Sequence, residues 1–241
     1  MFGKDMSYMS LFRGAAAFGD AKERPVLAGD AMSPVAVDPD TVITDAEYLV
    51  FDTELTGMKP RRDSIVSIGA VTMRGDRILV GRNFHRIVSP RTELTDKSVL
   101  IHGITPTEAA ESPSIVKVLP EFLDLCRGKV LVGHVVSIDI RFINREMEVL
   151  QGAALTNPAV DTMSLYGFLR KKTGDYCAFH EGVPGRADLF SLCKEYGIPV
   201  TRAHDALYDA FVTAQLFQRF LAVLPEYGIH TIKDLKRIGK P

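Results

Sequence analysis

Residues 48–54 read YLVFDTE, and two further apolar runs follow, SIVSIGAVTMRG at 64–75 and RILVGRNFHRIV at 77–88. β-Branched and aromatic residues are frequent in these runs, which favours strands over helices. The turn-like sequence RGDR joins the second run to the third. The three runs therefore predict an antiparallel meander.

Strands and helices alternate in the rest of the chain. KVLVGH at 129–134 is apolar at nearly every position, as a buried strand should be, and AVDT at 159–162 predicts a brief strand. The predicted helices span 105–112, 112–126 (opening after Ser112-Pro113), 137–150 (with Ser137 as its cap), 161–172, 187–197, 206–223 and 231–237. A meander followed by this alternation predicts an α/β fold, a mixed sheet flanked by helices on both faces.

Composition limits the classes of protein that this chain can belong to. Its 241 residues are 46% hydrophobic and 24% charged, which excludes a wholly disordered or fibrous chain. The three widely spaced cysteines argue against a disulfide framework, and we expect a cytoplasmic protein with no membrane-spanning helix. A net charge of −1 excludes coating of nucleic acid through bulk positive charge, although a local basic path remains possible.

The N-terminal part of the chain differs from the rest in its sequence pattern. Apolar residues recur every three to four positions within residues 2–12, which predicts a short amphipathic helix, and prolines between 25 and 39 indicate a linker. We therefore expect an N-terminal extension (1–45), a core domain (46–225) and a C-terminal helical tail (226–241). The extension is expected to serve docking, dimer contacts or solubility.

Asp52 and Glu54 are the first candidate site residues. They end an apolar strand two positions apart, so both carboxylates point to the same face, and Thr56-Gly57 permits a tight turn behind them. Acid pairs at this spacing also occur elsewhere in the chain, so the context carries the argument. Adjacent carboxylates repel unless a cation lies between them, and Mg²⁺ or Mn²⁺ prefers such oxygen ligands.

Three further candidates follow. Asp139 lies in the first turn of the helix after KVLVGH, where an α/β sheet presents groups to a ligand; a simple helix-dipole acid is the alternative. His204 and Asp209 lie about 140° apart on a regular helix and do not share a face. If Asp205 caps that helix, His204 lies on the preceding loop and Asp209 faces the sheet, whereas a surface pair is the alternative.

Five segments occur in order at characteristic separations: FDTELTG (51–57), IHGIT (101–105), GHVVSID (133–139), VDT (160–162) and HDALYDA (204–210). Together they resemble the DEDD superfamily of 3′–5′ exonucleases in its histidine-bearing branch. That branch includes the epsilon proofreading subunit of bacterial DNA polymerase and ribonuclease T. The resemblance covers residues 46–225 and implies that this region is an exonuclease domain with a ribonuclease H-like fold. Val135 stands where many relatives have Asn after the GH dipeptide.

The resemblance also implies a site and a reaction. The family's metal ligands correspond to Asp52, Glu54, Asp139 and Asp209, and its general base corresponds to His204. The implied nucleotide-binding residues are Thr53, Leu55, Thr56, His102 and Gly103. Two divalent cations, Mg²⁺ or Mn²⁺, would support release of nucleoside 5′-monophosphates from single-stranded or frayed 3′ ends.

The resemblance leaves the substrate and partners open. DNA is favoured, with RNA trimming as the alternative; a non-catalytic nucleic-acid-binding module is disfavoured because all four acids and the histidine are present. Single-stranded DNA or RNA 3′ ends are the expected partners, with a homodimer or a polymerase or repair partner contacting the extension.

Two other groups of residues are less specific. Cys177 and His180 form half of a zinc site, but no second pair follows at zinc spacing. The four arginines that could neutralise upstream phosphates, with solvated surface charge as the alternative, are Arg61, Arg62, Arg141 and Arg145.

Overall fold

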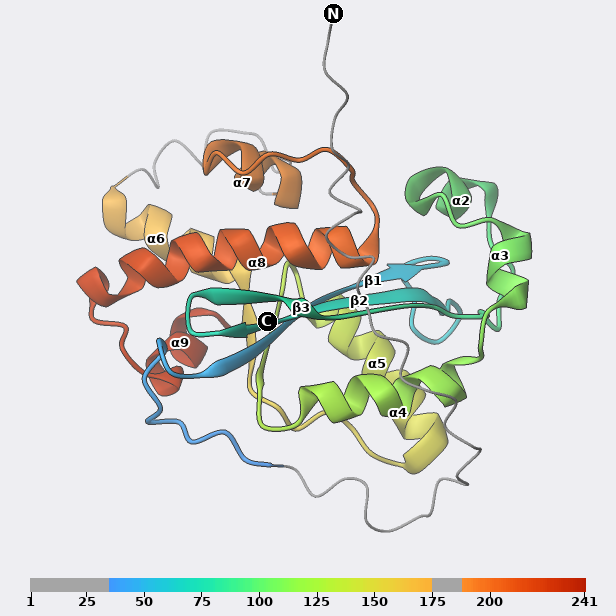
Figure 1. The fold of residues 1–241 in the computed structure, drawn as a ribbon, viewed down its shortest axis with the longest axis horizontal. Helices are drawn as coiled ribbons and strands as arrows, with labels where there is room; N and C mark the ends of the chain where they lie inside the picture. Colours follow the sequence, from blue (N-terminus) through green and yellow to red (C-terminus); the bar gives the residue numbers. More distant parts are fainter. Residues whose placement is uncertain (1–34, 175–187) are drawn as a thin grey trace, which may run out of the picture.

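The computed structural model describes residues 35–174 and 188–241. The amphipathic helix expected within residues 2–12 and the Cys177/His180 half-site lie outside these residues. The fold is built on one five-stranded sheet with strand order β3-β2-β1-β4-β5 (Figure 1). The strands are β1 (Glu47–Leu55), β2 (Ile65–Arg74), β3 (Arg77–Ile87), β4 (Val130–Gly133) and β5 (Ala159–Asp161).

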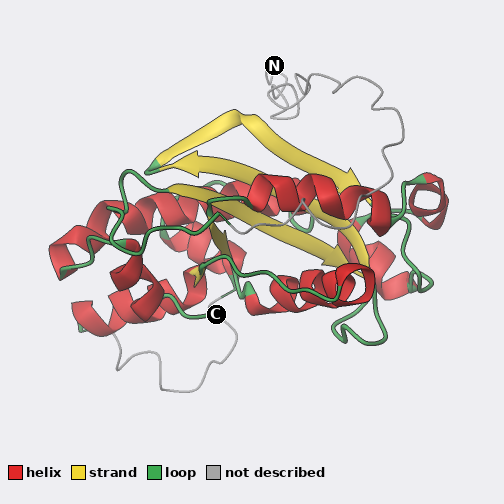
Figure 2. Ribbon diagram, turned by 90° about the horizontal axis from the view of Figure 1, so that it is seen from below, coloured by secondary structure: helices red, strands yellow, loops and turns green. Residues whose placement is uncertain are grey.

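The predicted meander is present, and Figure 2 shows its three long strands side by side. β4 pairs with β1 in parallel, and β5 pairs with β4 in parallel, so the sheet is mixed as expected. Alternation along β1 sends Tyr48 and Val50 into one hydrophobic core and Leu49 and Phe51 into the other. A strand buried on both sides requires helices on both faces.

Two layers of helices cover the sheet (Figure 1). One face carries α6 (Thr162–Thr173), α7 (Leu189–Glu195), α8 (Ala206–Val223) and α9 (Ile232–Ile238), and a short 3₁₀ helix, η2 (Leu224–Tyr227), follows α8. The other face carries α4 (Ile115–Cys126) and α5 (Ser137–Gln151). Two short helices, α2 (Asp96–His102) and α3 (Pro106–Glu111), lie beyond one end of the sheet. Within the described residues, no helix has both the length and the apolar character that crossing a bilayer requires.

Three details of the helices correct the sequence-based expectations. The helix expected to open after Ser112-Pro113 begins at Ile115, because Pro113 and Ser114 are held extended beside Ser89. Ser137 is the first residue of α5 rather than its cap. α2 was not expected from the sequence; its N-terminus is fixed by reciprocal hydrogen bonds between Thr95 and Ser98.

The described segment before β1 packs against the end of the chain. The backbone N–H of Ile43 donates to the carbonyl of His230 (2.9 Å), and that of Ile232 donates to the carbonyl of Thr41 (3.0 Å). The side chain of Ile43 is 1% exposed in the core beneath α9. The last residues of the expected linker are therefore part of the packed domain.

Candidate active site

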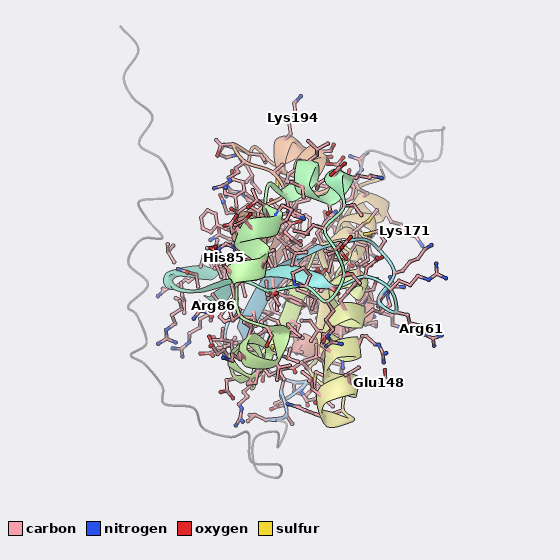
Figure 3. The ribbon with its side chains drawn as sticks, turned by 90° about the vertical axis from the view of Figure 1, so that its right-hand side faces the viewer. Arg61, His85, Arg86, Glu148, Lys171 and Lys194 are labelled. Carbon is pink, nitrogen blue, oxygen red and sulfur yellow. The ribbon has the colours of Figure 1, made fainter. Side chains whose placement is uncertain are left out.

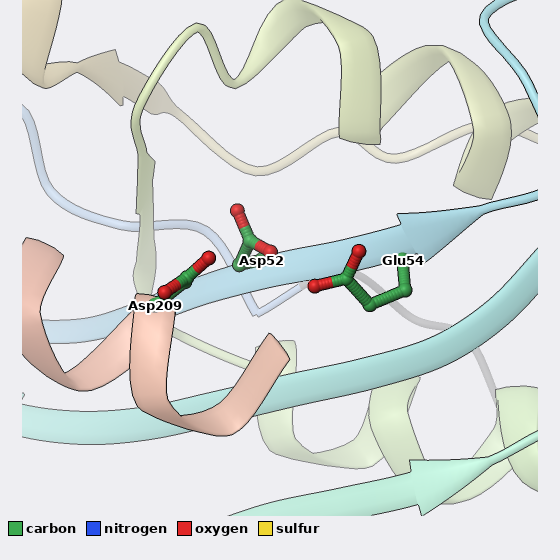
Figure 4. A group of neighbouring side chains, drawn as sticks. All are labelled: Asp52, Glu54 and Asp209. Atoms are coloured by element: carbon green, nitrogen blue, oxygen red, sulfur yellow. The ribbon is translucent and has the colours of Figure 1, made fainter. Parts of the chain in front are cut away.

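Three carboxylates converge at the end of β1. Asp52 and Glu54 come from β1 and Asp209 from the first turn of α8, and one oxygen of each lies within 4.8 Å of the other two. Their carboxylates point toward one another (Figure 4). Glu54 and Asp209 are buried. We call these three residues the acidic cluster.

Close contact between α8 and the sheet brings Asp209 to this position. Asp52 pairs across the meander with Gly69, and a Cβ atom at Gly69 would lie 2.1 Å from the backbone nitrogen of Leu207. Only glycine therefore allows the N-terminus of α8 to approach β2 so closely. As expected, Asp205 caps α8: its Oδ1 accepts a hydrogen bond from the backbone N–H of Tyr208 (3.0 Å).

Asp139 lies beside the acidic cluster but is not one of the three. It is buried in the first turn of α5, and its Oδ1 accepts hydrogen bonds from the backbone N–H (3.0 Å) and the hydroxyl (2.5 Å) of Thr53. Its charge contributes to raising the pKa of Asp52, so the two carboxylates interact. The structure thus groups three of the four expected acids and holds the fourth next to Asp52.

The protonation of these acids reflects their burial. Loss of solvation raises the pKa of Glu54 to about 8 and that of Asp209 to about 7. Burial likewise raises the pKa of Asp139 to about 7, although the hydrogen bonds from Thr53 oppose the change. For Asp52, burial first and then the charge of Asp139 raise the pKa well above its usual value.

The acidic cluster fits a divalent cation. Oδ1 of Asp209 is buried and has no hydrogen-bond partner among the described residues. Burying like-charged carboxylates is unfavourable unless a cation or protons compensate them, and hard divalent cations prefer oxygen ligands. The donor set and its orphaned oxygen are therefore suited to Mg²⁺ or Mn²⁺.

His204 lies on the loop just before α8, where the sequence places it. Its backbone N–H donates to Oδ2 of Asp209 (3.0 Å), and its exposed ring makes an edge contact with Phe190 (centroids 5.4 Å apart). The backbone of His204 adopts a left-handed conformation (φ +61°) that residues other than glycine seldom adopt. The main chain thus fixes the histidine at the edge of the acidic cluster.

A pocket of about 420 Å³ connects several expected site residues, since Glu54, His102, Gly103 and His204 all line it. Nδ1 of His102 accepts a hydrogen bond from the backbone N–H of Ile104 (3.0 Å), so its proton is assigned to Nε2. Nε2 is buried without a partner among the described residues, and burial lowers the pKa of this histidine. His102 therefore offers a neutral N–H donor at the pocket.

The other expected nucleotide-binding residues have partners within the protein. The hydroxyl of Thr53 binds Asp139, and Oγ1 of Thr56 accepts a hydrogen bond from the backbone N–H of Ser64 (2.9 Å). Leu55 is partly buried against the core beneath α4 and α5. Thr53 is thus positioned to orient Asp139, and Leu55 keeps a partly exposed apolar surface at the end of β1.

Sequence reasoning did not single out every residue of the pocket. Asn83, His85 and Ile87 line it from β3, and Arg202 lines it from the loop that carries His204. For β3 the spacing was a usable signal: Asn83, His85 and Ile87 lie two apart, and residues at this spacing in a strand share a face. For Arg202 no local pattern indicated a role.

Comparisons with known proteins identify the family. A family model described as exonuclease (RNase T) matches residues 49–217. DNA polymerase III of the PolC type from Thermotoga maritima is 30% identical over 226 residues, which cover 91% of this chain and 16% of that protein. The PolC-type polymerase of Staphylococcus aureus is 30% identical over 205 residues, covering 85% of this chain and 13% of that protein. The chain thus spans less than a fifth of these relatives.

Solved structures share the fold at lower identity. Exonuclease X in complex with 5′-overhanging duplex DNA has a TM-score of 0.59 at 22% identity, covering 79% of this chain and 98% of that one. The nuclease domain of 3′hExo, a DEDDh family member bound to rAMP, has a TM-score of 0.60 at 19% identity, covering 76% and 93%. These likenesses confirm the ribonuclease H-like architecture. With most of its length matched by the family model, the chain belongs to the RNase T exonuclease family.

Proposed function

We propose that this chain is a metal-dependent 3′–5′ exonuclease that releases nucleoside 5′-monophosphates from single-stranded or frayed DNA 3′ ends. The observation that carries the proposal is the convergence of Asp52, Glu54 and Asp209, with the backbone of His204 hydrogen-bonded to Asp209. Family membership supports nuclease chemistry at this site.

The acidic cluster would hold two divalent cations, Mg²⁺ or Mn²⁺, together with Asp139. When bound, such cations supply Lewis-acid stabilisation of the charge that develops on a phosphodiester during hydrolysis. Thr53 contributes by orienting the Asp139 carboxylate through two hydrogen bonds. Asp209 keeps Oδ1 free of hydrogen bonds for this purpose within the described residues.

His204 is the proposed general base. Its imidazole would accept a proton from the water that attacks the terminal phosphorus, while the bond from phosphorus to the 3′ oxygen breaks. The leaving 3′ oxygen takes a proton from solvent, so the products are a nucleoside 5′-monophosphate and a strand one nucleotide shorter. The loop position of His204 suits this role, because the exposed ring is free of hydrogen bonds to other described side chains.

The preference for DNA rests on the PolC-type DNA polymerases among the relatives, which also suggest a polymerase context for this domain. A solved exonuclease I carries a dT13 oligonucleotide, which supports single-stranded DNA. RNA trimming is the second candidate, because another fold neighbour is a 3′-exonuclease that recognises a histone mRNA stem-loop.

Matched 5′-labelled DNA and RNA oligonucleotides test the proposal. With Mg²⁺ or Mn²⁺ we expect DNA ladders that shorten from the 3′ end, faster than RNA, and no cleavage in EDTA or by Asp209→Asn. An oligonucleotide with a blocked 3′ end should resist degradation. Degradation of that blocked strand from its 5′ end at an undiminished rate, or binding without cleavage under every metal condition, would refute the proposal.

A further inference from the structure

A groove rich in positive charge lies between the β1–β2 loop and α5. Its volume is about 1010 Å³, and its charged lining residues are Lys59, Arg61, Arg62, Arg141, Arg145 and Glu148. Five of these six side chains are cations, whereas the whole chain has a net charge of −1. Such a concentration of one sign attracts a polyanion. We call this feature the basic groove.

Both walls of the basic groove continue elements that carry the acidic site. The loop wall follows β1, which carries Asp52 and Glu54, and the helix wall is α5, which carries Asp139. At about 1.5 Å of rise per residue, Arg145 lies about 9 Å along the helix axis from Asp139. Arg61 projects outward on the same side of the molecule as Glu148 (Figure 3). The groove is therefore built on the same two elements as the acidic site.

The loop wall has a defined shape. The backbone N–H groups of Arg62 and Asp63 both donate to the carbonyl of Lys59 (2.8 Å each), and Oδ2 of Asp63 accepts a hydrogen bond from the backbone N–H of Lys59 (2.7 Å). Gly57 lies against the Asp63 carboxylate, where a Cβ atom would approach to 2.5 Å. These contacts hold the turn from which Arg61 and Arg62 project.

The cations of the basic groove are available to a ligand. Within the described part of the chain, Arg61 and Arg62 make no ion pair. Arg145 pairs with Glu148 (3.0 Å), but both side chains are exposed, and exposed pairs contribute little. Nε of Arg141 donates to the carbonyl of Ser137 (2.9 Å), which leaves its terminal nitrogens free to bind an anion.

We propose that the basic groove binds the backbone phosphates of the single strand upstream of the 3′-terminal nucleotide, an inference that rests on the proposed function. The planar guanidinium groups of both walls match the geometry of phosphate oxygens. The lining also includes Met58, which is 66% exposed and offers an apolar surface to an unstacked base. Bases are exposed in this way only in a single strand.

Substitution of three groove arginines tests the proposal. The groove variant is Arg61→Gln/Arg62→Gln/Arg145→Gln, which leaves the acidic cluster and Arg141 unchanged. The control variant, Arg74→Gln/Arg77→Gln/Arg237→Gln, removes the same charge elsewhere. Arg74 and Arg77 flank the turn at the opposite end of the meander. Arg237, like Arg145, is exposed and forms an ion pair with an acid three residues away in its own helix.

Two measurements are expected to separate the variants. Binding of a labelled single-stranded 12-mer without divalent metal, followed by fluorescence anisotropy, should weaken on the order of tenfold or more in the groove variant. Its slope of log affinity against log salt should fall by about 2, since each single-strand phosphate contact contributes about 0.7. For cleavage, kcat/KM on the 12-mer should fall while that on a trimer stays near the wild-type value. The control variant should match the wild type in both.

Other outcomes would overturn the proposal. One is a groove variant whose salt slope and length dependence equal those of the wild type. Another is a control variant that loses as much binding and cleavage as the groove variant. A third is binding of polyglutamate as tight as that of the oligonucleotide, which would indicate an acidic protein partner. If the wild type cleaves the trimer and the groove variant binds and cleaves the 12-mer as the wild type does, the groove proposal fails and the proposed function stands. If the wild type cleaves nothing but the groove variant still loses binding of the 12-mer, the proposed function fails and the groove proposal stands.

Discussion

The backbone N–H of His204 donates a hydrogen bond to Oδ2 of Asp209, with 3.0 Å between the two atoms. The loop that carries the proposed base is thus tied to a proposed metal ligand through the main chain, not through the imidazole. Replacing the His204 side chain leaves this bond in place, whereas replacing Asp209 changes its acceptor. The two residues can therefore be tested separately, although they are only five positions apart.

We predict different failures for His204→Asn and Asp209→Asn. Asparagine tolerates the left-handed backbone of residue 204, so His204→Asn should fold, bind Mn²⁺ normally and lose turnover by roughly 10²–10⁴, as expected for loss of a general base. Asp209→Asn removes a charged ligand and should lose Mn²⁺ affinity together with turnover. Calorimetric titration with Mn²⁺ and single-turnover kinetics measure both effects. If His204→Asn loses Mn²⁺ as severely as Asp209→Asn, His204 supports metal binding and is not the general base.

The metal-free protein should lose stability as pH rises. The folded pKa values of Glu54 (about 8) and Asp209 (about 7) exceed the unfolded values of about 4, so the folded state binds more protons between these limits. For this contribution, stability is therefore greatest below about pH 4 and is lost as the pH rises from there to about 8. We expect Tm in EDTA to fall over this range and Mn²⁺ to restore it at pH 8.

Glu54→Gln provides the control for this pH dependence. It should flatten the Tm profile in EDTA and reduce the gain from Mn²⁺, whereas substitution of an exposed acid, Glu111→Gln, should leave both unchanged. A wild-type Tm in EDTA that is level or rising between pH 5 and 8 would contradict the assignment of this pH dependence to the buried carboxyl groups.

Local sequence patterns predicted the parts of the fold that depend on local preferences. The β-rich apolar runs and the turn between the last two identified the meander, and α8 begins at Ala206 and ends at Val223 as expected. α2 was missed because its N-terminus lacks the usual signature: the capping partner of Thr95 is Ser98 rather than Glu or Gln. By contrast, α3 begins with a proline after Thr105, a familiar start signal, and it was predicted.

The candidate site also combines features that the sequence predicted with features that it could not. The motif residues indicated which acids to examine, but not how each would be oriented. The orientation of Asp139 depends on Thr53, 86 positions earlier in the chain. The approach of α8 depends on Gly69, which the sequence pattern presents as one more residue of a strand. Such tertiary contacts follow from the packed structure alone.

Gly69→Ala should disable the site. The added Cβ would meet the backbone of Ala206 and Leu207 at 2.1–2.4 Å, and backbone atoms at a helix start cannot yield as a flexible side chain can. We expect a lower Tm, weaker Mn²⁺ binding and turnover reduced by at least about tenfold, since small displacements of positioned groups are costly. Gly167→Ala in α6 is the matched control: its Cβ meets nothing within 4 Å, so it should preserve turnover and raise stability by about 0.5–1 kcal/mol. Equal turnover of the two variants would show that activity does not require the close approach of α8 to β2.

Val135→Asn should stabilise the protein. Val135 has φ +56°, a left-handed conformation that is unfavourable for a β-branched residue by about 1–2 kcal/mol and that asparagine tolerates better. The residue lies between β4 and α5, so the strain is located just before the helix that carries Asp139. We expect thermal unfolding at a higher temperature with Mn²⁺ affinity unchanged. Val149→Asn, at an exposed position inside α5, should instead lower Tm, because asparagine is a poor residue for a helix interior.

Two N-terminal truncations should behave differently. All proposed metal ligands follow residue 44, so removing residues 1–34 should leave turnover on short oligonucleotides and Tm near the full-length values. Removing residues 1–44 also deletes Ile43, which is 1% exposed, and its hydrogen bond to His230, so Tm should fall by the equivalent of about 2–5 kcal/mol. Ile43→Ala in the full chain should reproduce most of that loss, and turnover of the folded fraction should persist in each case. A folded 1–34 deletion with turnover reduced by orders of magnitude would show instead that the extension completes the active site.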